Sequence, residues 1–312
     1  MHGRAPVTVG RVVRLAVVPS SSSAEPRLRS MPVLSPGGFV RLAWAEWGPE
    51  AAGRVVVCVH GLTRNARDFD VLAQDLAGLG WRVVSVDVPG RGRSEWLRRP
   101  EDYAYPFYAA ALAALIGRLG VEQVDWVGTS MGGLIGMMLA AQPASPIRRL
   151  VLNDIGAFIP QASLERIAQY VGRDPLFGSV DEVETYLRQV NAPFGPLSDA
   201  QWRHLASHSA LRAEDGRWRL HSDPAIGKAF ANAPIDDVAL WPAWEPIACP
   251  VLILRGGESD LLSRETAAEM TRRGVAAQAG KVRVHEIAGV GHAPALMALD
   301  QIALVREFLG GE

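Results

Sequence analysis

The chain has 312 residues, 48% of them hydrophobic, which is enough apolar material for one large α/β domain or two small ones. Its 32 Lys and Arg residues balance 33 Asp and Glu residues, so no basic excess is available for binding nucleic acid. No apolar run approaches the ~18 to 20 residues that a membrane span requires. Cys58 and Cys249 form no C-x-x-C pair, so we expect neither a disulfide framework nor a zinc site, and a reducing cytoplasm as the location.

The first 30 residues have the composition of a disordered leader. They contain a run of serines at 20–23 between two prolines. Three arginines precede a short apolar run at 15–18, as in a signal peptide, but that run is shorter than the ~7 to 15 residues of an export signal. We therefore predict a leader at 1–30 that is not an export signal.

From about residue 38, strand-like and helix-like segments alternate, which is typical of a mostly parallel sheet flanked by helices. The segment 40–47 alternates as an early antiparallel strand, whereas later strands are continuous apolar runs, buried on both faces. These runs lie at 55–59, 83–86, 124–127, 150–152, 251–254 and 282–287. Helices are expected at 66–79, 104–119, 131–142, 264–273 and 299–309.

One long segment, 157–245, interrupts this alternation. It contains helical patterns and loops rich in Pro and Trp, but no strand comparable to the others. We predict a helical cap inserted between the fourth and fifth parallel strands. The core is then formed by residues 31–156 and 246–312.

Residues 128–132 carry the motif G-x-S-x-G between a predicted strand and a predicted helix. Gly128 and Gly132 flank Ser130, as expected where a sharp turn brings backbones too close for side chains. The alternative is an ordinary strand-to-helix turn. The context favours Ser130 as a nucleophile at the carboxyl edge of the sheet.

A serine nucleophile needs a base, and the chain has seven histidines. His292 follows the last predicted strand and precedes the last helix, where a loop can bring its imidazole to the serine. His285 lies inside that strand and is interpreted as a sheet residue. His204 and His208 are four residues apart in the cap but lack the H-E-x-x-H pattern, so no metal site is predicted.

The base in turn needs a carboxylate, and two strand ends offer one. Asp260 follows the 251–254 strand, and Asp154 follows the 150–152 strand. Both preserve the chain order of serine, acid and histidine, so order cannot separate them. We favour Asp260 and interpret Asp154 as a turn residue where the cap begins.

An oxyanion hole requires backbone N–H groups near the nucleophile. Leu62, in the turn after the 55–59 strand, and Met131, directly after Ser130, are the predicted donors. His60 precedes the serine in the chain, so we interpret it as a structural hydrogen-bonding residue of that turn rather than a base.

Together these residues resemble the α/β-hydrolase superfamily, in particular the capped, esterase-like bacterial members with a serine nucleophile. The resemblance covers about residues 38–310 and includes the loop D-x-x-G-x-G-x-S at 87–94. It implies a sheet of the eight-stranded type, a nucleophile, acid and base at Ser130, Asp260 and His292, no cofactor or metal, and a pocket between cap and sheet.

The resemblance also implies a carboxylesterase that acts on small, short- to medium-chain acyl esters, hydroxyalkanoate esters among the candidates. Substrate contacts are expected from the following residues: Arg64, Asn65, Phe158, Tyr186 and Trp202. The alternative for the cap aromatics is that they form the cap's own core. Two other functions stay open, a hydrolase of carbon–carbon bonds in vinylogous keto acids with the same triad, and a non-catalytic binding protein on the same fold.

Overall fold

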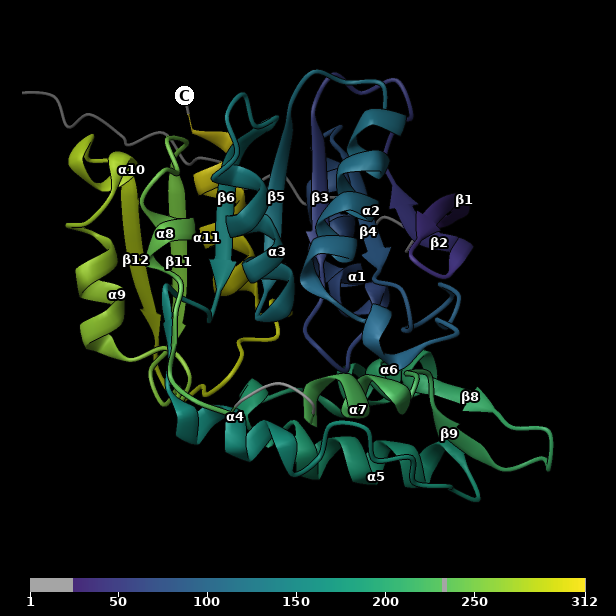
Figure 1. Cartoon of the computed structure of the whole chain (residues 1–312). Helices are drawn as coiled ribbons and strands as arrows, with labels where there is room; N and C mark the ends of the chain where they lie inside the picture. Colours follow the sequence, from purple (N-terminus) through teal and green to yellow (C-terminus); the bar gives the residue numbers. More distant parts are fainter. Residues whose placement is uncertain (1–24, 232–234, 312) are drawn as a thin grey trace, which may run out of the picture.

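The computed structural model describes residues 25–231 and 235–311 (Figure 1). Most of the predicted leader lies outside the described residues. Its last part is an exception, because residues 27–30 belong to the first strand, β1 (Arg27–Ser35). The predicted boundary at residue 30 is therefore wrong. β1 is an edge strand with mostly exposed side chains, so it lacks the apolar run that marks a buried strand.

The core is an eight-stranded sheet in the order β1-β2-β4-β3-β5-β6-β11-β12. Only β2 (Gly38–Trp47) runs against its neighbours, and every other pair in the sheet is parallel. The remaining strands are β3 (Val55–Val59), β4 (Arg82–Asp87), β5 (Val124–Thr129), β6 (Ile147–Asn153), β11 (Val251–Gly256) and β12 (Val282–Ile287). The predicted, mostly parallel sheet is confirmed.

Helices cover both faces of the sheet because its central strands are apolar on both sides. In β3 every residue is buried, and its alternate side chains reach two separate cores. Val57 packs in the core shared with α2 (Tyr105–Arg118) and α3 (Met131–Ala140). Val56 packs in the core shared with α1 (Asp70–Gly78) and α11 (Leu299–Gly310).

The remaining core helices are short. They are the 3-10 helices η1 (Ala66–Phe69) and η2 (Pro100–Asp102) and the α-helices α9 (Arg264–Met270) and α10 (Val275–Gln278). The predicted helix at 66–79 thus divides into η1 and α1. None of the described helices is long and apolar enough to cross a membrane.

Between β6 and β11 the chain forms a layer across the carboxyl ends of the strands (Figure 1). It contains α4 (Gln161–Ala168), α5 (Val180–Val190), η3 (Ala192–Phe194), α6 (Asp199–Ser209) and α7 (Ala225–Ala231). It also contains two small sheets, β7 (Phe158–Ile159) with β10 (Val238–Ala239) and β8 (Ala210–Arg212) with β9 (Trp218–Leu220). We call this layer the cap. The sequence predicted a helical cap, but the cap also contains these two pairs of strands.

The cap has its own apolar core, which includes Phe177, Leu187 and Trp202. One helix of the predicted cap segment packs elsewhere. Trp244 in α8 (Trp241–Trp244) is buried in the main core, in the same cluster as Ile135 of α3. The last part of the segment 157–245 thus packs against the core formed by the central sheet and α3, and not within the cap.

Candidate active site

Ser130 occupies a strained turn between β5 and α3. Its φ of 50° lies in the left-handed region, which costs a non-glycine residue energy and is tolerated where the surrounding structure enforces it. A Cβ at Gly128 would come within 2.4 Å of the Gly132 backbone, and a Cβ at Gly132 within 2.0 Å of the Val59 carbonyl oxygen. Both glycines are thus required for the turn that presents Ser130.

His292 bridges Ser130 and a buried carboxylate. Its Nε2 atom lies 3.0 Å from Ser130 Oγ, and its Nδ1 atom lies 2.7 Å from Asp154 Oδ2. Hydrogen bonds from distant segments hold the loop after β12, two of them close to His292. The Gly291 N–H donates to the Pro193 carbonyl oxygen at 2.8 Å, and the Asn153 amide donates to the Pro294 carbonyl oxygen at 2.8 Å.

The choice of Asp260 as the partner of His292 is wrong, because Asp154 occupies that place. Asp154 follows β6, is fully buried, and accepts hydrogen bonds from the Gly256 N–H at 2.7 Å and the Ser259 hydroxyl at 2.6 Å. Asp260 instead points toward α4, where its half-exposed side chain pairs with Arg166. The loop that carries Asp260 therefore contributes donors that hold Asp154, and not the carboxylate itself.

This arrangement fixes the protonation pattern of the imidazole. A carboxylate beside Nδ1 favours a proton on that nitrogen, and Nε2 is then free to accept the proton of the Ser130 hydroxyl. The Asp154 carboxylate would also stabilise the imidazolium that forms. The three side chains can therefore activate a serine oxygen for attack on a carbonyl carbon.

The turn after β3 passes beside Ser130. A Cβ built on Gly61 would lie 3.7 Å from the Cβ of Ser130. Among the backbone hydrogen bonds of the described residues, neither the Leu62 N–H nor the Met131 N–H is a donor. Both amides are thus available to a ligand, and their role as an oxyanion hole stays a prediction.

His60 fixes the peptide that carries the Leu62 N–H. Its buried imidazole has Nδ1 2.7 Å from the Gly61 carbonyl oxygen, and its Nε2 accepts the Val88 N–H at 3.0 Å. The Gly61 carbonyl and the Leu62 N–H belong to the same planar peptide group. Burial lowers the pKa of His60 from its ordinary 6.5 to about 3, so the ring is neutral and both contacts persist near neutral pH.

We expect His60 to make the protein sensitive to acid. Below pH 6.5 the unfolded chain binds a proton at His60, whereas the folded chain binds it only near pH 3. The free energy of unfolding therefore falls as the pH falls through this range. The free energy of unfolding falls by ~1.4 kcal/mol per pH unit, or by about 2 kcal/mol between pH 6.5 and pH 5. Urea unfolding at both pH values should show this loss for the wild type and a smaller loss for His60→Asn.

His285 is exposed on β12 and provides the matched control for this test. His285→Asn should keep the pH dependence of the wild type. An equal pH dependence in His60→Asn and the wild type would show that His60 does not cause the acid sensitivity.

Arg91 contacts both predicted oxyanion residues, Leu62 and Met131. Its fully buried guanidinium donates to the Leu62 carbonyl oxygen at 2.8 Å and to the Tyr108 hydroxyl at 2.7 Å, and it lies 3.6 Å from Met131 Sδ. Within the described residues it has no carboxylate partner closer than 4.0 Å. The motif at 87–94 contains this arginine, but nothing in the motif indicates that its side chain lies against the turn after β3.

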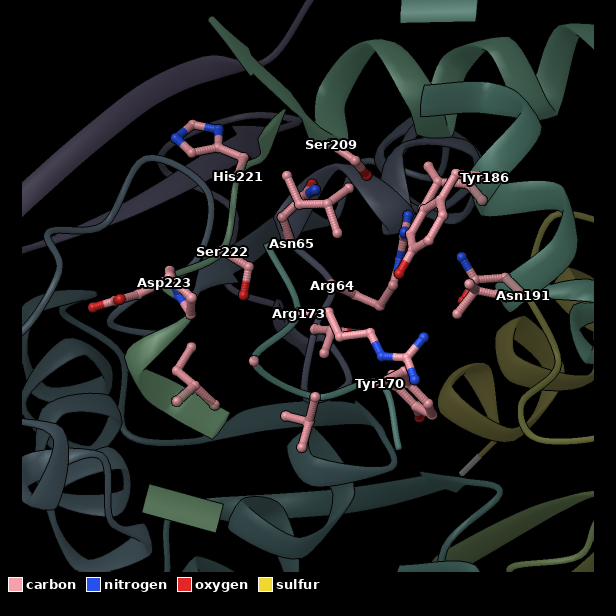
Figure 2. Close-up of a pocket in the computed structure, with 18 residues that line it drawn as sticks. Arg64, Asn65, Tyr170, Arg173, Tyr186, Asn191, Ser209, His221, Ser222 and Asp223 are labelled. Atoms are coloured by element: carbon pink, nitrogen blue, oxygen red, sulfur yellow. The ribbon is translucent and has the colours of Figure 1, made fainter. Parts of the chain in front are cut away.

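A pocket lies between the cap and the turn after β3 (Figure 2). Of the five predicted substrate contacts, Arg64, Asn65 and Tyr186 line it. Phe158 is placed instead in β7, which pairs with β10, and Trp202 is buried in the cap core. Aromatic spacing alone could not distinguish these packing residues from residues that line the pocket.

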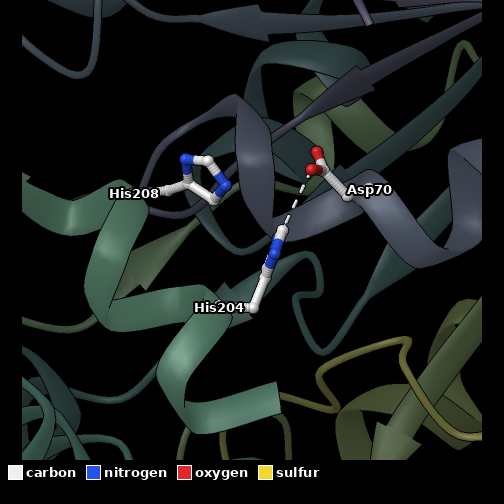
Figure 3. A group of neighbouring side chains, drawn as sticks. All are labelled: Asp70, His204 and His208. Atoms are coloured by element: carbon white, nitrogen blue, oxygen red, sulfur yellow. Dashed lines mark ion pairs between the residues drawn. The ribbon is translucent and has the colours of Figure 1, made fainter. Parts of the chain in front are cut away.

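One group of side chains in the described residues could bind a metal. The ligand atoms of Asp70, His204 and His208 lie within 4.8 Å of one another, and His204 Nε2 is 3.4 Å from Asp70 Oδ2 (Figure 3). The Arg67 guanidinium already pairs with the Asp70 carboxylate at 2.7 Å and would repel a cation. We interpret this group as a polar contact between α6 of the cap and the core.

Known proteins show the same organisation. A family model described as the alpha/beta hydrolase fold matches residues 54–296. The chain is 46% identical over 297 residues to the 3-hydroxybutyrate-oligomer hydrolase of Cupriavidus necator, a match that covers 93% of the chain and 99% of the relative. It is 28% identical over 240 residues to an esterase of Mycobacterium tuberculosis, a match that covers 76% of each.

Solved structures agree with this assignment. The structure of an alpha/beta hydrolase from Novosphingobium aromaticivorans matches with a TM-score of 0.80 and 34% sequence identity, over 92% of this chain and 99% of that one. The chain therefore belongs to the α/β-hydrolase fold family, which confirms the predicted fold and the predicted class of enzyme, a hydrolase.

Proposed function

We propose that the protein hydrolyses small carboxylic esters, with Ser130 as nucleophile, His292 as base and Asp154 as the carboxylate that orients the base. The observation that carries this proposal is the continuous chain of hydrogen bonds from Ser130 Oγ through His292 to Asp154. The distance from Ser130 Oγ to His292 Nε2 is 3.0 Å and that from His292 Nδ1 to Asp154 Oδ2 is 2.7 Å, both within the range required for proton transfer.

In the first half of the reaction, Ser130 Oγ attacks the ester carbonyl carbon and His292 Nε2 takes the hydroxyl proton. The carbonyl oxygen becomes an oxyanion, which the N–H groups of Leu62 and Met131 stabilise. When the intermediate collapses, the bond to the leaving oxygen breaks and His292 returns the proton to it. The products of this half are a free alcohol and an acyl group on Ser130.

In the second half, water replaces the alcohol. His292 removes a proton from the water, whose oxygen attacks the acyl carbon, and a second oxyanion forms in the same hole. Collapse returns the proton to Ser130 and releases the carboxylic acid. Arg91 donates to the carbonyl oxygen of Leu62 at 2.8 Å, so it helps to hold the residue that supplies one of the two N–H groups in both halves.

The substrate class that we propose is short oligomers of hydroxyalkanoic acids. Support comes from the relative in Cupriavidus necator, whose name states hydrolysis of 3-hydroxybutyrate oligomers and which matches nearly the whole chain. These compounds are small esters with one free carboxylate, and the pocket is lined by polar side chains, Arg64, Asn65 and Arg173 among them, together with apolar ones.

Hydrolysis rates test the proposal. We expect the wild type to cleave the dimer of 3-hydroxybutyrate and p-nitrophenyl esters, with the highest kcat/KM at short acyl chains in a series from acetyl to dodecanoyl. Labelling of Ser130 by a fluorophosphonate without turnover of any ester would contradict ester hydrolysis and favour a carbon–carbon bond hydrolase. Neither labelling nor turnover would favour a binding protein.

A further inference from the structure

Arg173 is an exposed cation at the edge of the pocket. It lies between α4 and α5 and lines the pocket. Three other cap arginines, Arg166, Arg188 and Arg219, each form an ion pair with a carboxylate. In the part of the chain that the structure describes, Arg173 forms none, and its neighbour Asp174 pairs with Arg219 at 2.6 Å.

The carboxylates near the pocket bind other partners than Arg173. Asp223 is the lining residue with a carboxylate, and its oxygens accept hydrogen bonds from the Tyr103 hydroxyl and, at 2.9 Å, from the Ala225 N–H. Asp68 pairs with Arg64 at 2.7 Å. In Figure 2 the Arg173 guanidinium lies close to Tyr170, while Asp223 points away from it. Within the described residues, the Arg173 guanidinium at this pocket therefore forms no ion pair with a carboxylate.

A second, independent observation indicates a ligand in the same pocket. The Ser209 hydroxyl lines it, the residue is only 5% exposed, and its Oγ has no hydrogen-bond partner among the described residues. A buried hydroxyl without a partner costs ~1 to 3 kcal/mol, so native structures rarely leave one unused. A bound oxygen acceptor would satisfy it.

The pocket has the size and place of a subsite. Its cavity volume of about 40 Å³ admits a small polar group but not a whole oligomer. One of its lining residues is Thr63, which directly follows the predicted oxyanion residue Leu62 in the chain. A group that contacts Thr63 therefore lies one residue along the turn from the predicted oxyanion donor Leu62.

We propose that Arg173 and Ser209 form a subsite for the free carboxylate of an ester oligomer, which selects anionic over neutral esters. This inference rests on the proposed ester hydrolysis and specifies the end of the oligomer at which cleavage occurs. The carboxyl-terminal hydroxy acid occupies the subsite and is the leaving alcohol, while the rest of the oligomer is transferred to Ser130. Water then releases that remainder, so each cycle removes one hydroxy acid from the carboxyl end.

A matched pair of substrates tests the subsite, the 3-hydroxybutyrate trimer as the free acid and as its terminal methyl ester. The wild type should show a kcat/KM about tenfold to a hundredfold higher for the acid, the range expected for a charge-assisted hydrogen bond. Arg173→Gln should remove most of this ratio and Ser209→Ala a smaller part. Arg173→Lys, which keeps the charge, should restore part of it.

Arg217 is the control, because it is an exposed cap arginine that pairs with Asp215 outside the pocket. Arg217→Gln should keep the ratio of the wild type. The subsite is refuted if the wild type does not prefer the acid, or if Arg173→Gln prefers it as strongly as the wild type does. Turnover of p-nitrophenyl esters with no preference for the acid would refute the subsite and leave ester hydrolysis intact.

Binding tests the same idea without turnover. Calorimetry on the Ser130→Ala protein should show tighter binding of the free acid than of the methyl ester, and Arg173→Gln in that background should remove the difference. Equal binding of the two compounds to Ser130→Ala would refute the subsite even if no ester is hydrolysed.

Discussion

Replacing Ser130 by alanine should lower kcat for ester hydrolysis by about 10⁶-fold, because no other group in this mechanism can form the acyl intermediate. Initial rates with p-nitrophenyl butyrate measure the effect. A thermal melt shows whether the variant is folded, which we expect because alanine removes only the hydroxyl from a turn fixed by Gly128 and Gly132.

An exposed serine of the cap provides the control. Ser207 lies on α6, and its hydroxyl donates only to the Arg203 carbonyl oxygen one turn earlier. Ser207→Ala should hydrolyse the ester at the rate of the wild type. If Ser130→Ala retained a rate within tenfold of the wild type, the nucleophile would have to be another residue.

Replacing Asp154 by asparagine should lower kcat by about 10⁴-fold. The asparagine side chain can present an N–H to His292 Nδ1, which favours the tautomer with its proton on Nε2 and removes the acceptor for the Ser130 proton. Initial rates with the same ester measure the loss. The position of the Asp154 carboxylate, 2.7 Å from the imidazole, is the basis for this expectation.

Asp260→Asn is the informative comparison, because the sequence favoured this residue. Its carboxylate forms a partly exposed ion pair with Arg166, and exposed pairs contribute only about 0 to 1 kcal/mol. We therefore expect kcat to stay within a few-fold of the wild type. A larger loss in Asp260→Asn than in Asp154→Asn would show that Asp260 supports His292 during catalysis.

The sheet and most of its helices could be predicted because their signals are local. β3 was predicted with both ends correct, since five successive apolar residues between polar ones fit a strand buried on both faces. Ser130 was found through glycines that a tight turn requires. His292 was found because it follows the last strand, and the carboxyl ends of parallel strands meet at one edge.

The carboxylate could not be chosen in the same way. Asp154 and Asp260 both follow neighbouring parallel strands, β6 and β11, and both lie between the serine and the histidine in the chain. What separates them is the direction of each side chain. That direction depends on the Gly256 N–H and the Ser259 hydroxyl, which hold Asp154 across more than 100 residues of sequence.

The cap shows the same limit for substrate contacts. Trp202 and Tyr186 are both aromatic residues of cap helices, but one packs in the cap core and the other also lines the pocket. Arg173 and Ser209 carry no motif, and they stand out only because tertiary structure leaves one without an ion pair and the other without a hydrogen bond. Such contacts depend on packing between distant segments, which local patterns do not encode.

Trapping the acyl intermediate tests the central claim most directly. The protein is mixed with p-nitrophenyl butyrate, quenched in acid during turnover, digested and analysed by mass spectrometry. A butyryl group on the peptide that contains Ser130, absent from the Ser130→Ala protein, is the predicted result. Release of p-nitrophenol at the full rate with no acyl group on Ser130, or with the acyl group on another residue, would contradict the mechanism.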